Sequence, residues 1–232
     1  MRITKNENIC IIPARGGSKR LPGKNLKFFF GKPIIFYVIN KVKKTNFFDK
    51  IIVSTDSADI AKYSKKLGAH VHLRSKHYSR DNAKFKDVIA NIINDSEIKD
   101  SKYKKICCFY PTSIFFKVSD LRLAFKKLKR NINFIFTAKK YDHPIERAFK
   151  KKGNSLQMFN TKMEMKNTQN LPIYYYDAAQ FYLGWFDSWK KRKKIFQGNS
   201  DFIEIPKLNS QDIDNYKDWQ NAKILWKLGN IK

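Results

Sequence analysis

Short apolar runs alternate with amphipathic segments along most of the chain, and this alternation constrains the fold more than any other feature. Runs of strand length occur at residues 9–14, 51–53, 71–73, 106–110, 132–137, 178–183 and 203–205. Segments with apolar residues at helical spacing occur at 33–44, 57–67, 84–93, 118–128 and 216–228. This rhythm predicts an α/β fold with a mostly parallel sheet and helices on both faces.

The rhythm stops between residues 139 and 171, where the sequence is polar and includes the stretch KKKGN, which is typical of a hairpin turn. We interpret this segment as a small inserted β-arm. A chain of 232 residues can bury a sizeable core in one domain. We therefore expect a single domain over residues 1–232 that carries the arm within it.

A formal net charge of +28 raises the question of a nucleic-acid partner. The basic residues are mostly lysine and are spread along the chain, whereas dedicated phosphate and base recognition favours arginine. We expect no specific nucleic-acid partner, and a non-enzymatic polyanion-binding protein is the distant alternative. No apolar run reaches the roughly 20 residues of a membrane span, and the N-terminus does not resemble a signal peptide. These features predict a cytoplasmic protein without a membrane span.

A loop rich in glycine and basic residues, IPARGGSKRLPGKN, follows the first predicted strand. Gly16 and Gly17 allow backbone N–H groups to approach an anion closely, and Arg15, Arg20 and Lys24 can neutralise a polyphosphate. The loop fits neither the Walker A pattern nor G-x-G-x-x-G, so kinase and dehydrogenase functions have no support. Ligands of open α/β sheets bind at the carboxyl ends of strands, so this loop predicts a phosphate site.

The stretch Gln-Asp-Ile-Asp places two carboxylates, Asp212 and Asp214, two residues apart. In extended backbone both would face the same side and could bind one hard cation such as Mg²⁺ (or Mn²⁺). The alternative is that Asp214 caps the helix predicted over 216–228.

Two further polar residues follow predicted strands. Asp56 could contact a ribose or a metal, or it could cap the next helix. Arg74 opens a polar loop and could contact a base or phosphate, or it could belong to an ordinary surface loop. The residues alone leave both questions open.

The loop IIPARGGSKRLPGKN resembles the signature of the cytidylyltransferases that activate nine-carbon sugars of the sialic-acid type, the CMP-acylneuraminate synthetases and their relatives. The stretches VSTDSADIAKYSKKLGA, RSKHYSRDNAKFKDVI, YPTS and QDIDNYKDW extend the similarity over most of the chain. The resemblance implies a Rossmann-like nucleotidyltransferase fold. It implies the reaction of CTP with a nonulosonic acid to give a CMP-sugar and pyrophosphate. It also implies a homodimer joined through the arm at 139–171.

The motifs and the resemblance together give a set of site residues. The expected nucleotide-binding residues are Arg15, Gly16, Gly17, Ser18, Arg20, Lys24, Asn25, Asp56, Arg74 and Ala83. The expected catalytic residues are Arg15, Lys24, Asp212 and Asp214, and the two aspartates would hold the metal. No residue stands out as the general base.

Two departures from the sialic-acid pattern bear on the substrate. Tyr110 stands where those synthetases typically have a glutamine that contacts the sugar, and residues 176–184 read YDAAQFYLG instead of an Asn-Gly-Ala stretch. The pattern Tyr-Asp-Ala-x-Gln-Phe-Tyr resembles the branch that acts on pseudaminic acid. Tyr110, Asp177, Gln180 and Tyr182 are therefore the expected sugar contacts, with core packing as the alternative for the last three. Pseudaminic acid is the expected substrate, and N-acetylneuraminate or legionaminate is the alternative.

Overall fold

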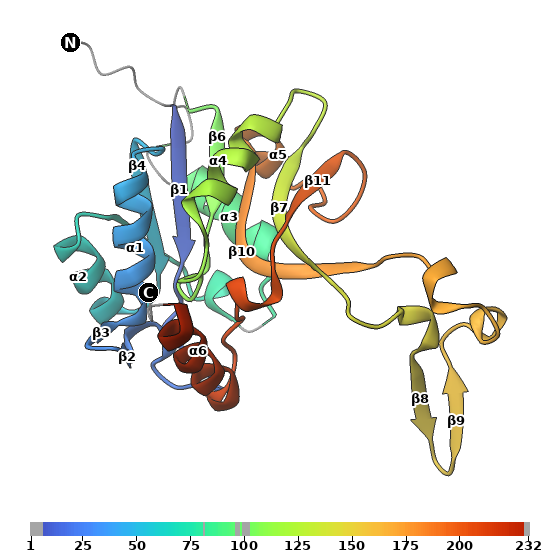
Figure 1. Ribbon diagram of the computed structural model, residues 1–232. Helices are drawn as coiled ribbons and strands as arrows, with labels where there is room; N and C mark the ends of the chain where they lie inside the picture. The colour runs from blue at the N-terminus through green and yellow to red at the C-terminus, as the bar shows by residue number, and fades with distance from the viewer. Residues whose placement is uncertain (1–6, 81, 96–97, 99–102, 230–232) are drawn as a thin grey trace.

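The computed structural model describes residues 7–80, 82–95, 98 and 103–229, and its centre is a seven-stranded sheet. The strands are β1 (Asn8–Pro13), β4 (Lys50–Thr55), β5 (His70–Leu73), β6 (Lys105–Cys108), β7 (Phe134–Lys140), β10 (Tyr175–Trp185) and β11 (Ser200–Glu204). Their order is β11-β7-β10-β6-β1-β4-β5 (Figure 1). Only β10 runs antiparallel to its two neighbours, β6 and β7. The mostly parallel sheet predicted from the sequence is confirmed.

Helices cover both faces of the sheet. The helices α1 (Ile34–Thr45), α2 (Ala58–Lys66), α4 (Val118–Lys127) and α6 (Tyr216–Gly229) pack on one face, and α3 (Phe85–Asp95) and α5 (Phe186–Lys190) pack on the other. Strand β1 shows why, because Cys10 and Ile12 belong to the core of the first face while Ile9 and Ile11 belong to the second. Alternate side chains of a strand point to opposite faces, so a continuous apolar run serves two cores.

Three elements do not appear among the sequence expectations. Helix α5 follows β10 directly, and two short strands, β2 (Phe28–Phe29) and β3 (Lys32–Pro33), form a small antiparallel ribbon before α1. Phe29 of this ribbon packs edge-on against Trp219 and Trp226 of α6. The last helix is therefore anchored beside the segment that follows the glycine-rich loop.

The strand order contains a switch point beside β1. The chain moves outward from β1 through β4 to β5 and then returns to the other side of β1 with β6. The connections that leave β1 and β6 diverge at their carboxyl ends, and this divergence opens a crevice for ligands. Because β10 is antiparallel, its first residues lie at this same edge of the sheet.

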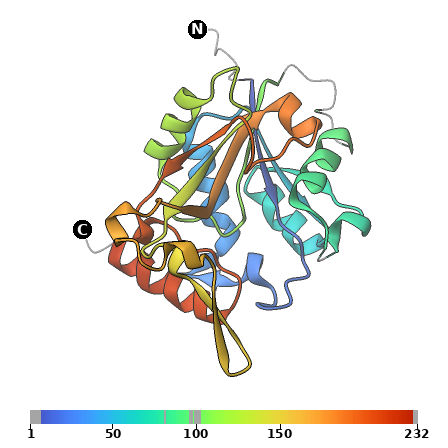
Figure 2. The same cartoon turned by 90° about the vertical axis from the view of Figure 1, so that its right-hand side faces the viewer.

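An arm leaves the sheet after β7 and returns at β10 (Figure 1). Its tip is a hairpin of β8 (Phe149–Lys152) and β9 (Ser155–Met158), which points below the sheet when the molecule is viewed from the arm side (Figure 2). At its root the amide of Tyr141 donates to the carbonyl of Tyr174 at 2.9 Å. The sequence places the excursion at 139–171, whereas β7 extends to Lys140 and the sheet resumes at Tyr175.

Within the described residues, no helix has the length and apolar character needed to cross a bilayer.

Candidate active site

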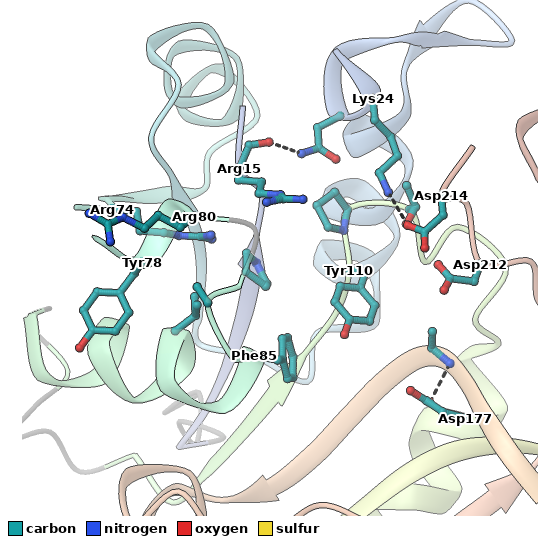
Figure 3. Close-up of a pocket in the computed structure, with 17 residues that line it drawn as sticks. Arg15, Lys24, Arg74, Tyr78, Arg80, Phe85, Tyr110, Asp177, Asp212 and Asp214 are labelled. Atoms are coloured by element: carbon teal, nitrogen blue, oxygen red, sulfur yellow. Dashed lines mark hydrogen bonds and ion pairs between the residues drawn. The ribbon is translucent and has the colours of Figure 1, made fainter. Parts of the chain in front are cut away.

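A pocket of about 390 Å³ lies at the carboxyl edge of the sheet, at the switch point (Figure 3). Residues from the loops after β1, β5 and β6, from the start of α3, from the start of β10 and from the segment before α6 line it. The lining residues are Pro13, Arg15, Lys24, Asn25, Arg74, Tyr78, Arg80, Ala83, Phe85, Val88, Tyr110, Pro111, Thr112, Asp177, Ala179, Asp212 and Asp214. Segments far apart in the sequence thus form one cavity.

Asp56 holds the glycine-rich loop in place through a hydrogen bond to its backbone. The carboxylate of Asp56 accepts a hydrogen bond from the amide of Gly16 at 2.7 Å. A Cβ on Gly16 would lie 3.0 Å from the Cβ of Ser57, so the loop approaches α2 closely. The cap of α2 is Ser57, whose hydroxyl accepts from the amide of Ile60 at 3.4 Å. Asp56 is therefore neither the helix cap nor a lining residue of the pocket; it orders the loop.

Lys24 joins the loop to the C-terminal part of the chain. Gly23 adopts a left-handed φ of 65°, which starts the 3-10 turn Lys24–Leu26, and Asn25 Nδ2 donates to the Arg15 carbonyl at 2.9 Å. Lys24 Nζ donates to the carbonyl of Ile213 at 2.5 Å and lies 3.3 Å from Asp214 Oδ1. The phosphate-type loop and the paired aspartates are thus held as one unit.

The paired aspartates are available to a ligand because other residues cap α6. Asn215 Oδ1 accepts from the amide of Asp218, and Asp218 Oδ2 accepts from the amides of Asp214 and Asn215 at 3.0 and 3.1 Å. This reciprocal pattern satisfies the free amides at the start of the helix. The alternative role of Asp214 as a helix cap is therefore wrong, and its carboxylate instead accepts from Arg20 Nη2 at 2.7 Å.

The two carboxylates fit a hard divalent cation. Asp212 and Asp214 both line the pocket, and burial within the crevice together with the nearby charge of Asp214 raises the pKa of Asp212, while Lys24 acts in the opposite direction. A cation would relieve this repulsion, and carboxylate oxygens are preferred ligands of Mg²⁺ and Mn²⁺. No group of three or more potential ligands occurs within the described part of the chain. The remaining ligands of such a cation would come from a substrate and from water.

Cations form the opposite wall of the pocket. Arg74 is buried, and its Nε and Nη2 donate to the hydroxyl and the carbonyl of Ser54 at 3.2 and 2.9 Å. Burial lowers the pKa of Arg74 to about 10, with Asp56 raising it and Arg15 lowering it. Arg15 and Arg80 line the same wall. The pocket suits a polyanion on this side and a metal-bound anion on the other.

A break in the regular pairing of β10 brings Asp177 into the pocket. The register with β7 shifts between Asp177 and Tyr182, and Ala179 adopts a left-handed φ of 53° within the shift. Asp177 Oδ1 accepts from the amide of Ala179 at 2.9 Å, and Tyr182 donates its hydroxyl to Asp177 Oδ2. Tyr182 is also hydrogen-bonded to Tyr110. The side chains of Asp177, Tyr182 and Tyr110 thus form a hydrogen-bonded chain.

A second cavity of about 410 Å³ adjoins the first, and it has a mostly apolar, aromatic wall. It shares Phe85, Tyr110 and Asp177 with the first pocket. Its other lining residues are Lys86, Tyr182, Lys194, Ile195, Phe196 and Gln197. A cationic pocket and an apolar pocket therefore meet at one edge.

Most of the residues expected from the sequence meet here. Arg15, Lys24, Asn25, Arg74, Ala83, Tyr110, Asp177, Asp212 and Asp214 line the first cavity, and Tyr182 lines the second. Gly16, Gly17, Ser18, Arg20 and Asp56 belong to the loop and its supports but do not line either cavity. Gln180 is not brought to either cavity: it is 1% exposed, and its Nε2 donates to the Ala178 carbonyl at 3.1 Å.

Sequence reasoning missed several residues of the site. Arg80 and Phe85 lie in and just after the polar loop that Arg74 opens, so the loop itself was the available signal. Ile195 and Phe196 follow a lysine-rich stretch with no motif that marks them. Lys139 is buried at the end of β7, and its Nζ donates to the Ser210 carbonyl at 2.8 Å near Asp212.

Comparison with known proteins gives consistent results. The family model described as cytidylyltransferase matches residues 9–228. The pseudaminic acid cytidylyltransferase of Campylobacter jejuni is 36% identical over 97% of this chain and 98% of its own length. The N-acylneuraminate cytidylyltransferase of Streptococcus agalactiae is 28% identical over 91% of this chain and 51% of its own length.

A solved structure of CMP:2-keto-3-deoxy-manno-octonic acid synthetase complexed with CTP has the same fold, with a TM-score of 0.71 at 13% identity. The alignment covers 97% of this chain and 100% of the other. The fold is therefore that of the nucleotidyltransferases, as the resemblance implies. On the family match and the relative aligned over nearly its full length, the chain belongs to the cytidylyltransferase family of nucleotidyltransferase enzymes.

Proposed function

We propose that this enzyme transfers the CMP unit of CTP to a nonulosonic acid, that the acid is pseudaminic acid, and that pyrophosphate is released. The observation that carries the proposal is the meeting of two unlike cavities at Asp177, Tyr110 and Phe85. One cavity is lined by four basic residues and three aspartates and suits a nucleoside triphosphate with a bound cation. The other is aromatic and suits a sugar that carries apolar substituents.

The nucleotide would occupy the first cavity. Arg15, Lys24 and the amides of the loop from Gly16 to Ser18 would neutralise and orient the phosphates, and Asn25 would lie beside them. Arg74 and Ala83 would lie at the cytosine side. Arg20 and Asp56 would act indirectly, because they hydrogen-bond to Asp214 and Gly16 and hold those residues in position. These residues would orient the α-phosphorus for attack by the sugar hydroxyl in line with the leaving pyrophosphate.

Asp212 and Asp214 would hold a divalent cation, which we propose is Mg²⁺ or Mn²⁺. When bound, such a cation supplies charge neutralisation and polarisation of phosphate oxygens. Lys24 and Arg20 pair with Asp214 and keep the segment at the pocket wall.

The sugar acid would occupy the second cavity. Asp177, Tyr110 and Tyr182 present hydrogen-bonding groups to it, while Ile195 and Phe196 present apolar surface for its acyl and methyl groups. The pseudaminic acid assignment is supported by the 36% identity to the Campylobacter jejuni enzyme of that name. Gln180, which the sequence suggests as a fourth contact, would serve the site only from within the core.

We also propose that the enzyme works as a homodimer in the cytoplasm, where CTP is available. The arm carries exposed apolar side chains, namely Phe149 at 66%, Leu156 at 67%, Phe159 at 71% and Met165 at 93% exposure. Exposed apolar side chains on a projecting arm favour burial against another protein surface. Sedimentation of the purified protein and of a Phe149→Ser/Leu156→Ser variant tests this, and a wild-type monomer at all concentrations would contradict it.

The substrate is tested by measuring pyrophosphate release with CTP, Mg²⁺ and a panel of sugar acids. The panel is pseudaminic acid, N-acetylneuraminic acid, legionaminic acid and an octulosonic acid. We expect the highest kcat/KM with pseudaminic acid. Turnover confined to N-acetylneuraminate or legionaminate would contradict the substrate, and no turnover with any acid would contradict the function.

A matched pair of variants tests the site. Asp212→Asn should abolish turnover and the Mg²⁺-dependent part of CTP binding, whereas Asp59→Asn, an exposed residue of α2, should not. Thermal stabilisation by CTP with Mg²⁺ also separates this function from general polyanion binding. A polyanion-binding protein would instead bind any nucleic-acid duplex, with an affinity that falls steeply as the salt concentration rises.

A further inference from the structure

The carboxylate of Asp177 stands where the two cavities meet. It lines both of them, and Figure 3 shows it on the same side of the pocket as Asp212, with Tyr110 nearby. If the nucleotide occupies the cationic cavity and the sugar acid the aromatic one, the reacting hydroxyl and the α-phosphorus meet at this junction. A group at the junction can therefore reach the proton that must leave during attack.

The position of Asp177 at the junction depends on a strained backbone conformation in β10. Alternation along a regular strand would place residues 177 and 182 on opposite faces because their separation is odd. The register shift, with Ala179 at a φ of 53°, brings Asp177 and Tyr182 together instead. A left-handed alanine costs about 1 kcal/mol, so the surrounding structure supports this arrangement against a local preference.

Asp177 differs from the other carboxylates of the pocket in its partners. Asp214 accepts from Lys24 and Arg20, and Asp212 stands beside it as the second residue that would hold the cation. Within the described chain, the hydrogen-bond donors to Asp177 are both neutral, namely the amide of Ala179 and the hydroxyl of Tyr182. A carboxylate without a cationic partner stays basic enough to take up a proton.

The burial of the Asp177 carboxylate also favours its protonated form. Burial raises the pKa of Asp177, while its hydrogen bonds from Tyr182 and Ala179 lower it. The like charges of Asp177 and Asp212 interact, since Asp177 raises the pKa of Asp212, and the phenols of Tyr110 and Tyr182 stay protonated because burial raises the pKa of each. Of the three hydrogen-bonded side chains, Asp177 is thus the one that can take up a proton, since both phenols stay protonated.

We propose that Asp177 is the general base of the transfer reaction, and that Tyr182, supported by Tyr110, orients its carboxylate. This inference rests on the proposed function. In the step, a lone pair of the anomeric oxygen forms the new O–P bond at the α-phosphorus. The bond from the α-phosphorus to the bridging oxygen breaks, and its electron pair leaves with pyrophosphate. The hydroxyl proton passes to a carboxylate oxygen of Asp177 and then to solvent.

The test is single-turnover CMP-sugar formation from about pH 5 to about pH 9 with saturating CTP, Mg²⁺ and pseudaminic acid. Asp177→Asn should lower the rate at neutral pH by about 100-fold or more, because general bases contribute roughly 10²- to 10⁴-fold. It should also remove the acid limb of the pH profile while calorimetric CTP affinity is unchanged. Tyr182→Phe should keep the acid limb but move its midpoint to higher pH, because Tyr182 lowers the pKa of Asp177. Asp59→Asn is the control.

Several outcomes would overturn the inference. Wild-type rates in Asp177→Asn would remove the role, and a rise in sugar KM with the acid limb intact would show a binding role instead. If Asp177→Asn does not fold, an unshifted acid limb in Tyr182→Phe overturns the inference. No turnover by the wild type with any sugar acid would refute the proposed function, and the inference with it. Turnover by the wild type with a different acid would refute only the substrate, and the variants would then be measured with that acid.

Discussion

Replacing Lys24 by methionine tests whether one ammonium group both joins the glycine-rich loop to the C-terminal segment and binds phosphate. Lys24 Nζ lies 2.5 Å from the carbonyl of Ile213, a fully buried residue, and the lysine side chain is only 19% exposed. Methionine keeps most of the length and apolar contact of the lysine stem but removes its charge and its donors. The Ile213 carbonyl then loses its donor.

The size of the effect follows from these contacts. A hydrogen bond to a charged group contributes about 1.5 to 3 kcal/mol, so the free energy of unfolding should fall by about that amount. For a chain of this length each kcal/mol shifts the melting temperature by about 2 to 4 °C, which gives a fall of about 3 to 12 °C without nucleotide. Loss of one such bond to a phosphate should raise the Kd for CTP by about 10- to 150-fold.

The assays are thermal denaturation without nucleotide and calorimetric titration with CTP and Mg²⁺. Lys19→Met is the matched control, because Lys19 is exposed in the same loop, does not line the pocket, and carries the same charge. Both variants change the net charge equally, so only position distinguishes them. Equal losses in the two variants would show that overall charge, and not this contact, is responsible. An unchanged melting temperature and CTP affinity in Lys24→Met would refute the reasoning.

Three further predictions follow from the fold and the site. Gly184→Ala should destabilise the protein by at least about 1 to 3 kcal/mol in urea unfolding, because a Cβ there would overlap the ring of Phe134, whereas Gly17→Ala has open space and should not. Burial lowers the pKa of Lys41 from 10.5 to about 8, so the unfolded chain binds more protons above pH 8 and stability should rise between about pH 8 and 10.5 by about 3 kcal/mol. Lys41→Met should abolish that rise, and an identical pH profile would contradict it. Removing divalent cations with a chelator should abolish the extra thermal stabilisation by CTP in the wild type and leave Asp212→Asn unchanged; an equal response in both would exclude Asp212 as a ligand.

The alternation of apolar runs and amphipathic segments was sufficient to predict most of the fold. Strand β1 and helix α1 lie within one residue of their predicted limits, because each serves a core that the pattern marks directly. The direction of β10 was not predictable in this way, because an apolar run has the same pattern in either direction. Helix α5 was missed because it follows β10 without a turn signal.

The site was predictable where a motif lies directly after a strand, and less so where neighbouring polar residues compete. For Asp56 and Asp214 the adjacent residues, Ser57 and Asn215, are the helix caps, and this choice depends on backbone angles that the sequence does not state. Contacts such as that of Lys24 with Ile213 join residues 189 positions apart and exist only once the sheet has formed. The shift at Ala179 changes which side chains of β10 share a face, so simple alternation could not place Asp177 beside Tyr182.

The antiparallel course of β10 has a consequence for how the enzyme responds to dilution. The arm ends at Tyr174, β10 begins at Tyr175, and Asp177 follows two residues later, so no spacer separates the root of the arm from the edge of the active site. If a second subunit holds the arm, it also restrains the residues that lead into Asp177. Specific activity per subunit is then expected to fall when the enzyme is diluted below the concentration at which the dimer dissociates, even with both substrates saturating.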